Sequence, residues 1–129
     1  MKKQNILDSK KRCQKFRLRI LEISQKVKAI HSGGAFSCIE IVDSIYNFLM
    51  RKKNARFYDT FLMSKGHGCM AQYVILENLK ILKKKYLDKY CTKDGLLGCH
   101  PDYGNPGIEA STGSLGHGMG LAVGMAHAD

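Results

Sequence analysis

The chain has 129 residues, of which 44% are hydrophobic and 25% are charged. This length suits one domain with a real core, so a function that needs several domains would need further polypeptide. No apolar run approaches the roughly 20 residues that cross a bilayer, and the basic start lacks the apolar stretch of an export signal. We therefore expect a cytoplasmic protein without a membrane segment.

Charge divides the chain into two parts. All 21 Lys and Arg residues lie within residues 1–93, and residues 94–129 carry acidic residues but no Lys or Arg. A basic chain raises the question of nucleic-acid binding, because clustered cations neutralise phosphates. Here the basic residues alternate with apolar ones, as they do on the solvated faces of helices. We therefore do not expect nucleic acid as a partner.

The cysteines give no sign of a disulfide framework. Their number is five and no two stand at CxxC spacing; they are Cys13, Cys38, Cys69, Cys91 and Cys99. An odd number without such pairs favours free thiols over a disulfide framework or a zinc ribbon.

Two helices are predicted in the first part of the chain. An apolar stripe at steps of three and four residues predicts the first; it comprises Cys13, Phe16, Ile20, Ile23, Val27 and Ile30. That helix should end at Gly33 and Gly34, and Ser37 with Glu40 forms the pattern of a capping box for a second helix. The buried face of the second helix is predicted to comprise Ile41, Val42, Ile45, Tyr46 and Leu49.

The second half of the chain is predicted to contain one strand, three helices and a long loop. Residues 61–63 form a short apolar run before a turn, which predicts one buried strand of an α/β sheet. A third helix is predicted over residues 70–79 and a short fourth over 86–90. Residues 94–112 predict an extended loop, which at this length is more often functional than idle. Residues 115–126 predict a helix whose glycines allow close approach to a neighbour.

Four of the five histidines stand in or beside glycine-rich turns: His31, His67, His100 and His117. An imidazole in such a turn can bind phosphate or move a proton near neutral pH. One alone would be read as a solvent-facing or structurally bonded side chain, whereas four favour a ligand site. A zinc site is the alternative, but none of them has a second His or Cys at ligand spacing within a helix turn.

Five short motifs follow one another in the chain: HSGG at residues 31–34, SKGHG at 64–68, GCHP at 98–101, PGIE at 106–109 and TGSLG at 112–116. In their order and spacing, the sequence resembles the amino-terminal, thiamine-diphosphate-binding region of the transketolase family, especially its forms split into two chains. The resemblance implies an α/β, three-layer thiamine-diphosphate-binding fold with a mainly parallel sheet, of which this chain holds the first half. It implies a domain over residues 12–129, preceded by a basic extension over residues 1–11.

The resemblance also implies roles for single residues. His67 matches the histidine that contacts the diphosphate, and Gly113, Ser114 and Leu115 match the segment that cradles the cofactor. His31 and His100 match the histidines that line the substrate channel and assist catalysis. The chain departs from the family at Ile30 and Cys99, which stand where glycine is usual, and at Gly68, which stands where alanine is usual.

The activity implied is transfer of a two-carbon ketol unit between sugar phosphates, in carbohydrate metabolism of the pentose phosphate type. The cofactors implied are thiamine diphosphate and Mg²⁺, whose Asp-Gly-Asp/Glu motif would lie beyond Asp129, so we expect no magnesium ligands in this chain. Activity would need further chain, a homo-oligomer or a complementary C-terminal transketolase chain, and the isolated chain should be inactive. A non-catalytic remnant or an interaction module on this scaffold is the alternative.

Overall fold

The computed structural model describes residues 3–28, 30–54 and 56–128. Its α-helices are α1 (Lys3–Ser24), α2 (Ser32–Phe36), α3 (Ile39–Ser44), α4 (Cys69–Asn78), α5 (Lys84–Asp88) and α6 (His117–Ala128). A π-helical turn, η1 (Ile45–Leu49), follows α3, and a 3₁₀ turn, η2 (Gly66–Gly68), precedes α4. The strands β1 (Lys52–Lys53) and β2 (Arg56–Phe57) pair antiparallel, with Lys52 opposite Phe57 and Lys53 opposite Arg56.

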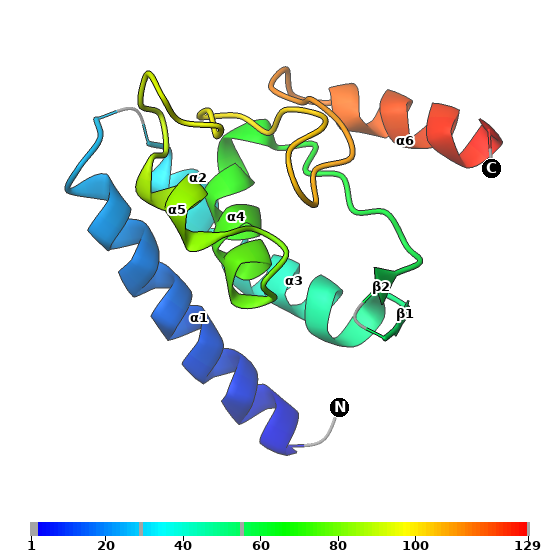
Figure 1. Cartoon of the computed structure of the whole chain (residues 1–129). Helices are drawn as coiled ribbons and strands as arrows, with labels where there is room; N and C mark the ends of the chain where they lie inside the picture. Colours follow the sequence, from blue (N-terminus) through cyan, green and yellow to red (C-terminus); the bar gives the residue numbers. More distant parts are fainter. Residues whose placement is uncertain (1–2, 29, 55, 129) are drawn as a thin grey trace.

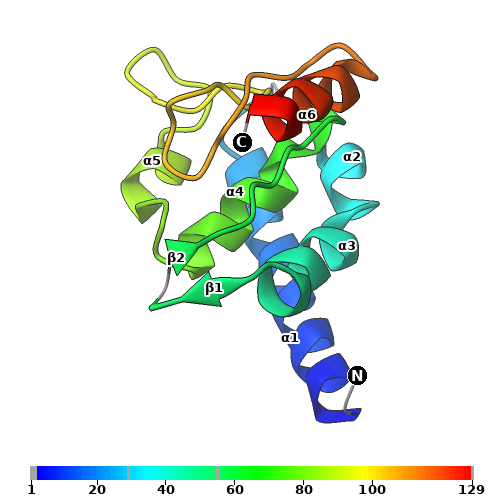
Figure 2. The same ribbon diagram turned by 90° about the vertical axis from the view of Figure 1, so that its right-hand side faces the viewer.

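Helix α4 is the centre of the core. Every residue from Cys69 to Leu76 is buried, as expected for a helix that is apolar on nearly all sides. Helices α1, α2, α3 and α5 pack against it, while the long loop and α6 lie on the side away from the N-terminal end of α1 (Figures 1 and 2). The helix predicted over residues 70–79 is confirmed, and so is the short one, seen as α5.

Helix α1 confirms the predicted stripe and corrects its end. Cys13, Phe16, Ile20 and Ile23 are buried. The helix ends at Ser24, however, where the Ser24 hydroxyl donates to the Leu21 carbonyl at 2.7 Å and competes with helix continuation. It runs unbroken across residues 11 and 12, where the family resemblance places the start of the domain; that boundary stays a prediction.

The capping box predicted at Ser37 is wrong. Gly33 and Gly34 lie inside α2, Ser37 follows its last turn, and the Ser37 hydroxyl donates to the Gly34 carbonyl at 3.0 Å. Helix α3 begins after Cys38 without a side-chain cap.

The predicted inward face of the second helix is right at Val42 and Tyr46 and wrong at two positions. Ile41 is 62% exposed and Leu49 is 71% exposed. In η1 the Met50 amide donates to the Ile45 carbonyl at 2.9 Å. This wider turn moves the next inward position from Leu49 to Met50.

The strand predicted over residues 61–63 is also wrong. Residues 61–63 belong to neither helix nor strand, and β1 and β2 form the one sheet in the described part of the chain. A strand exists only through a neighbour that completes its hydrogen bonds, and no pairing partner of this segment lies within the described ranges. The mainly parallel sheet therefore stays a prediction.

The predictions of a long loop and of a last helix are confirmed. Residues 89–116 contain neither helix nor strand, and α6 begins at His117. Of the glycines in α6, Gly118 makes a close approach, because a Cβ there would lie 2.5 Å from the Cβ of Ser64. All five cysteines are free thiols, as predicted. No helix among residues 3–28, 30–54 and 56–128 has the length and apolarity to span a bilayer.

One buried carboxylate ties α1 to α3. Asp43 is fully buried and accepts hydrogen bonds from Ser9 Oγ at 2.6 Å and from Arg12 Nε at 2.9 Å. Asn47 Nδ2 donates to it at 2.9 Å. Hydrogen bonding to Asp43 raises the pKa of Arg12, so the guanidinium is charged at any physiological pH.

Asp43→Asn should lower the free energy of unfolding by about 3 kcal/mol, because it leaves a partly buried guanidinium without its counter-charge. Urea unfolding followed by circular dichroism measures the change. Glu40→Gln is the matched control: its pair with Arg17, at 2.6 Å, is more exposed, and exposed pairs contribute at most about 1 kcal/mol. Equal losses in the two variants would contradict this ranking.

Candidate functional site

Three histidines from three separate motifs lie together. His31 stands just before α2, His67 lies in η2, and His100 lies in the long loop. The ring of His31 lies 5.8 Å from that of His67 and 5.7 Å from that of His100, measured between centroids. We call His31, His67 and His100 the histidine cluster. Their roles stay predictions, but their grouping is a property of the fold.

Helix α2 approaches His67 through Gly34. A Cβ on Gly34 would lie 2.7 Å from His67 Cδ2 and 2.8 Å from the His67 carbonyl oxygen. Real Cβ atoms do not make such contacts, so any side chain here would push α2 and η2 apart. Gly34 thus sets the distance between the two segments that carry His31 and His67, and it does so inside a helix rather than as a helix stop.

The TGSLG motif is clamped onto the SKGHG turn. A Cβ on Gly66 would lie 2.7 Å from the Thr112 carbonyl oxygen and 2.9 Å from Gly113 Cα. The Thr112 hydroxyl donates to the Met63 carbonyl at 2.6 Å, and the Thr112 amide donates to the Pro101 carbonyl at 3.2 Å. These contacts hold Gly113 at the edge of the histidine cluster.

Of the three residues predicted to cradle a cofactor, Gly113 is the one in contact with the cluster. A Cβ on Gly113 would lie 3.6 Å from His100 Cδ2. Ser114 is exposed, and Leu115 is 71% exposed. His117, the fourth histidine noted in the sequence, is exposed at the start of α6.

The helical turn at His67 lies at the start of α4, and its Gly66 is buried against Thr112 and Gly113. Turn η2 begins at Gly66 and continues directly into α4, and no side chain caps either element. The amides of Gly66 and His67 therefore lie at the positive end of the helix dipole, where phosphate groups bind. The Lys65 Nζ group is turned to Ser37 Oγ, 2.8 Å away, so its charge lies at the α2 side of this turn.

Two supports of His100 were missed by sequence reasoning. The Tyr73 hydroxyl donates to the His100 carbonyl at 3.0 Å, and burial raises the pKa of Tyr73 well above its usual value. The hydroxyl therefore stays a donor. The Cys99 thiol lies 3.4 Å from His100 Nδ1. The departure from glycine at residue 99 was the one signal of the second contact; Tyr73 lies in the helix predicted over residues 70–79, and nothing in the sequence indicated its bond to His100.

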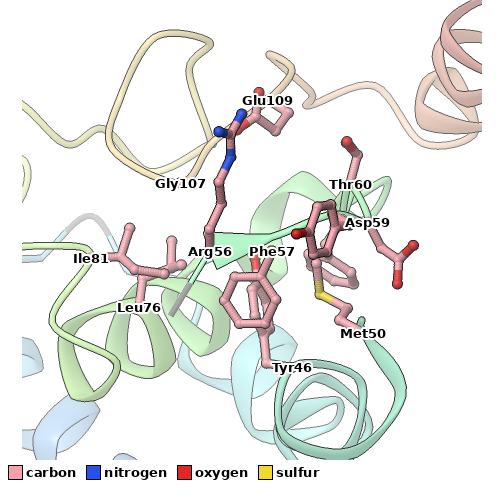
Figure 3. Close-up of a pocket in the computed structure, with 12 residues that line it drawn as sticks. Tyr46, Met50, Arg56, Phe57, Asp59, Thr60, Leu76, Ile81, Gly107 and Glu109 are labelled. Carbon is pink, nitrogen blue, oxygen red and sulfur yellow. The ribbon is translucent and has the colours of Figure 1, made fainter. Parts of the chain in front are cut away.

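A hollow of about 410 Å³ lies beside β2, away from the histidine cluster. Figure 3 shows the Tyr46 and Phe57 rings low in this pocket and Arg56 extending toward Glu109 across it. The two rings stand edge to face with centroids 5.5 Å apart. Burial raises the pKa of Tyr46 to about 12, so its hydroxyl is neutral. None of the three clustered histidines lines this pocket.

A metal site is not formed by this part of the molecule alone. Among residues 3–28, 30–54 and 56–128, no three His, Cys, Asp or Glu side chains are placed to hold a metal ion. The histidine cluster consists of imidazoles and backbone amides, which suit an anionic ligand rather than Mg²⁺, a cation that prefers oxygen donors.

Comparisons with known proteins bear on this arrangement. The family model for the thiamine diphosphate binding domain of transketolase matches residues 9–129. One of the subunits of apulose-4-phosphate transketolase from Phocaeicola vulgatus is 40% identical over 119 residues, which cover 89% of this chain and 42% of that protein. Transketolase 7 of Craterostigma plantagineum is 32% identical over 120 residues, covering 88% of this chain and 18% of that one.

A solved structure is also similar to this chain. Transketolase from Leishmania mexicana superposes with a TM-score of 0.77 at 28% identity, over 92% of this chain and 18% of that one. The chain thus spans less than half the length of these relatives.

Gly66→Ala should displace Thr112 and Gly113 from the histidine cluster, because its Cβ has no room against their backbone. We expect large amide shifts at residues 112–116 in ¹H–¹⁵N NMR spectra and a loss of stability of about 2 kcal/mol, as for overpacking in a core. Gly33→Ala is the control, since nothing lies within 4 Å of its Cβ position. Unshifted amides at residues 112–116 in Gly66→Ala would refute the clamp.

Proposed function

This chain belongs to the family of the transketolase thiamine diphosphate binding domain, and from this premise we propose that it is part of a thiamine-diphosphate-dependent transketolase. The proposed reaction transfers a two-carbon ketol unit between sugar phosphates. The observation that carries the proposal is the histidine cluster: imidazoles from three distant motifs stand 5.7 and 5.8 Å apart, beside Gly113. A cytoplasmic location stays a prediction.

The residues present fit the diphosphate end of this cofactor. Gly66 and Gly113 have no side chains and their backbones pack closely together, and the His67 imidazole and the start of η2 lie beside them. Backbone amides at a helix start and an imidazole donor are suited to phosphate oxygens. We therefore assign His67 and Gly113 to the diphosphate, with Ser114 and Leu115 continuing the cradle.

The chemistry of bond making belongs to the cofactor, which when bound supplies the carbanion stabilisation that ketol transfer needs. His31 and His100 would orient sugar hydroxyls and hold or move protons there, because an imidazole can both donate and accept near neutral pH. The Tyr73 hydroxyl fixes the His100 backbone at 3.0 Å. This anchoring would keep the His100 ring facing His31 when a substrate enters.

We propose that further polypeptide completes the enzyme and supplies the Mg²⁺ ligands. The Phocaeicola relative is named as one of the subunits of its enzyme, which supports a complementary second chain; a homo-oligomer is the other arrangement. The surface of α6 supports such a contact, because Met119 is 74% exposed and Val123 is 67% exposed. Clustered exposed apolar side chains of this kind mark interaction surfaces. The chain alone should not turn over.

Isothermal titration with thiamine diphosphate tests the cofactor site. We expect weak binding by the isolated chain and a loss of at least tenfold in affinity in His67→Ala, because the imidazole donor is removed. His127→Ala, at the far end of α6, should bind like the parent. Titrations with and without Mg²⁺ should agree if the ligands of the metal lie elsewhere.

Two outcomes would count against this assignment. Equal affinities for the parent and His67→Ala would remove the cofactor from the SKGHG turn. An absence of binding in both chains, with the fold intact by circular dichroism, would favour a transketolase-like scaffold that does not bind the cofactor by itself.

The exposed face of α6 should drive association. We expect the mass from light scattering to rise with concentration, since burying each of Met119 and Val123 is worth about 1.5–3 kcal/mol. The double variant Met119→Glu, Val123→Glu should stay monomeric. Leu18→Glu, at a position on α1 that is 62% exposed, should associate like the parent. A monomer at all concentrations in the parent would overturn this prediction.

A further inference from the structure

The backbone on both sides of Cys99 is held by α4. The Cys69 thiol donates to the Cys99 carbonyl at 3.3 Å, and the Tyr73 hydroxyl donates to the His100 carbonyl at 3.0 Å. Cys69 and Tyr73 stand four residues apart on one face of α4, and both are buried. The backbone that carries Cys99 and His100 is therefore fixed to the central helix of the core.

This fixed backbone places the Cys99 thiol beside the His100 ring. The Cys99 sulfur lies 3.4 Å from His100 Nδ1, within hydrogen-bond distance for sulfur. A cysteine side chain has a single torsion before its sulfur, with about three staggered positions. With the backbone held on both sides, few alternatives to this contact are open to the thiol.

The chemistry of the two groups decides which of them donates. A thiol is a weak donor and its sulfur is a weak acceptor, whereas the unprotonated nitrogen of an imidazole is a base and the stronger acceptor. The bond from the thiol to Nδ1 is therefore favoured over a bond from the ring to sulfur. In a neutral imidazole, an Nδ1 atom that accepts leaves the ring proton on Nε2.

Nε2 is the ring nitrogen of His100 that is left for a ligand. In the described part of the chain, no group makes a hydrogen bond to it. The neighbouring ring atom, Cδ2, lies 3.6 Å from the position of a Cβ on Gly113, and the His31 ring lies 5.7 Å away between centroids. Cys99 and the histidine cluster thus meet His100 on different flanks of its ring.

We propose that Cys99 is a positioning residue for His100: its thiol donates to Nδ1, places the ring proton on Nε2 and presents His100 to a ligand as a hydrogen-bond donor. The state of the ring stands on these contacts alone, and its use in sugar recognition rests on the proposed function. Hydroxyl and carbonyl oxygens of a sugar can accept a bond from Nε2. The glycine that is usual in the family at residue 99 has no side chain to supply this donor.

Long-range ¹H–¹⁵N NMR on the ¹⁵N-labelled chain tests the proposal, at about pH 8.5, where imidazoles are neutral. A ring nitrogen with a proton and one without have widely separated ¹⁵N signals, and exchange between the two tautomers draws the signals together. For the parent we expect fully separated His100 signals with the proton on Nε2. In Cys99→Ala the two signals should move toward each other. His100→Gln assigns them.

Two further variants distinguish the donor from the bulk of the side chain. Cys99→Ser keeps a donor at this position and should keep the His100 signals separated. Cys38→Ala removes a half-buried thiol that bonds to the Gly34 carbonyl instead, and it should leave the His100 signals as they are in the parent. Backbone amide spectra that change only near the substituted residue would show that each variant is folded.

Three results would each overturn the proposal. The first is a proton on Nδ1 of His100 in the parent, which needs no variant to be observed. The others are parent-like His100 signals in Cys99→Ala, and signals in Cys99→Ser that match those of Cys99→Ala. Because no measurement uses thiamine diphosphate, failure here is distinguishable from failure of the titration.

Discussion

The contact between the Gly66 backbone and the Thr112–Gly113 backbone is the constraint on which the candidate site depends. A single Cβ at Gly66 would come within 2.7 Å of a carbonyl oxygen. Backbone against backbone is the closest packing that a chain can reach, and glycine alone permits it here. This contact brings the TGSLG motif against the SKGHG motif. The hydrogen bond from the Thr112 hydroxyl to the Met63 carbonyl, at 2.6 Å, fixes the register between them.

The site is carried by the most buried element of the molecule. Turn η2 runs directly into α4, whose residues from Cys69 to Leu76 are all buried. His67 therefore sits on a rigid helix start, and the Asp43 network holds α1 and α3 around that helix. The other two histidines lie outside regular helix, and each is fixed to this platform by one tight contact, Gly34 for His31 and Tyr73 for His100.

Sequence periodicity predicted α1, α4 and α5 because the local spacing of apolar residues defines each of these helices, and the small, apolar composition of residues 115–126 predicted α6. It failed at Ser37, where packing of Gly34 on His67 decides where the helix runs, and at residues 61–63, where a strand needs a distant partner. The grouping of His31, His67 and His100 could be expected only from the family resemblance. No local rule places residues so far apart in one cluster, and the bond from Tyr73 to the His100 carbonyl could not be predicted for the same reason.

Charge supports the proposal that further polypeptide completes this site. Residues 94–129 carry no Lys or Arg, and the Lys65 ammonium is bonded to Ser37. A diphosphate beside His67 and Gly113 would thus meet imidazoles, amide dipoles and the single Lys65 ammonium at the α2 side, which offset only part of its charge. The rest of that charge calls for a cation. Because no three potential ligands in the described residues are placed to hold a metal, that cation and its ligands would come from outside this part of the chain.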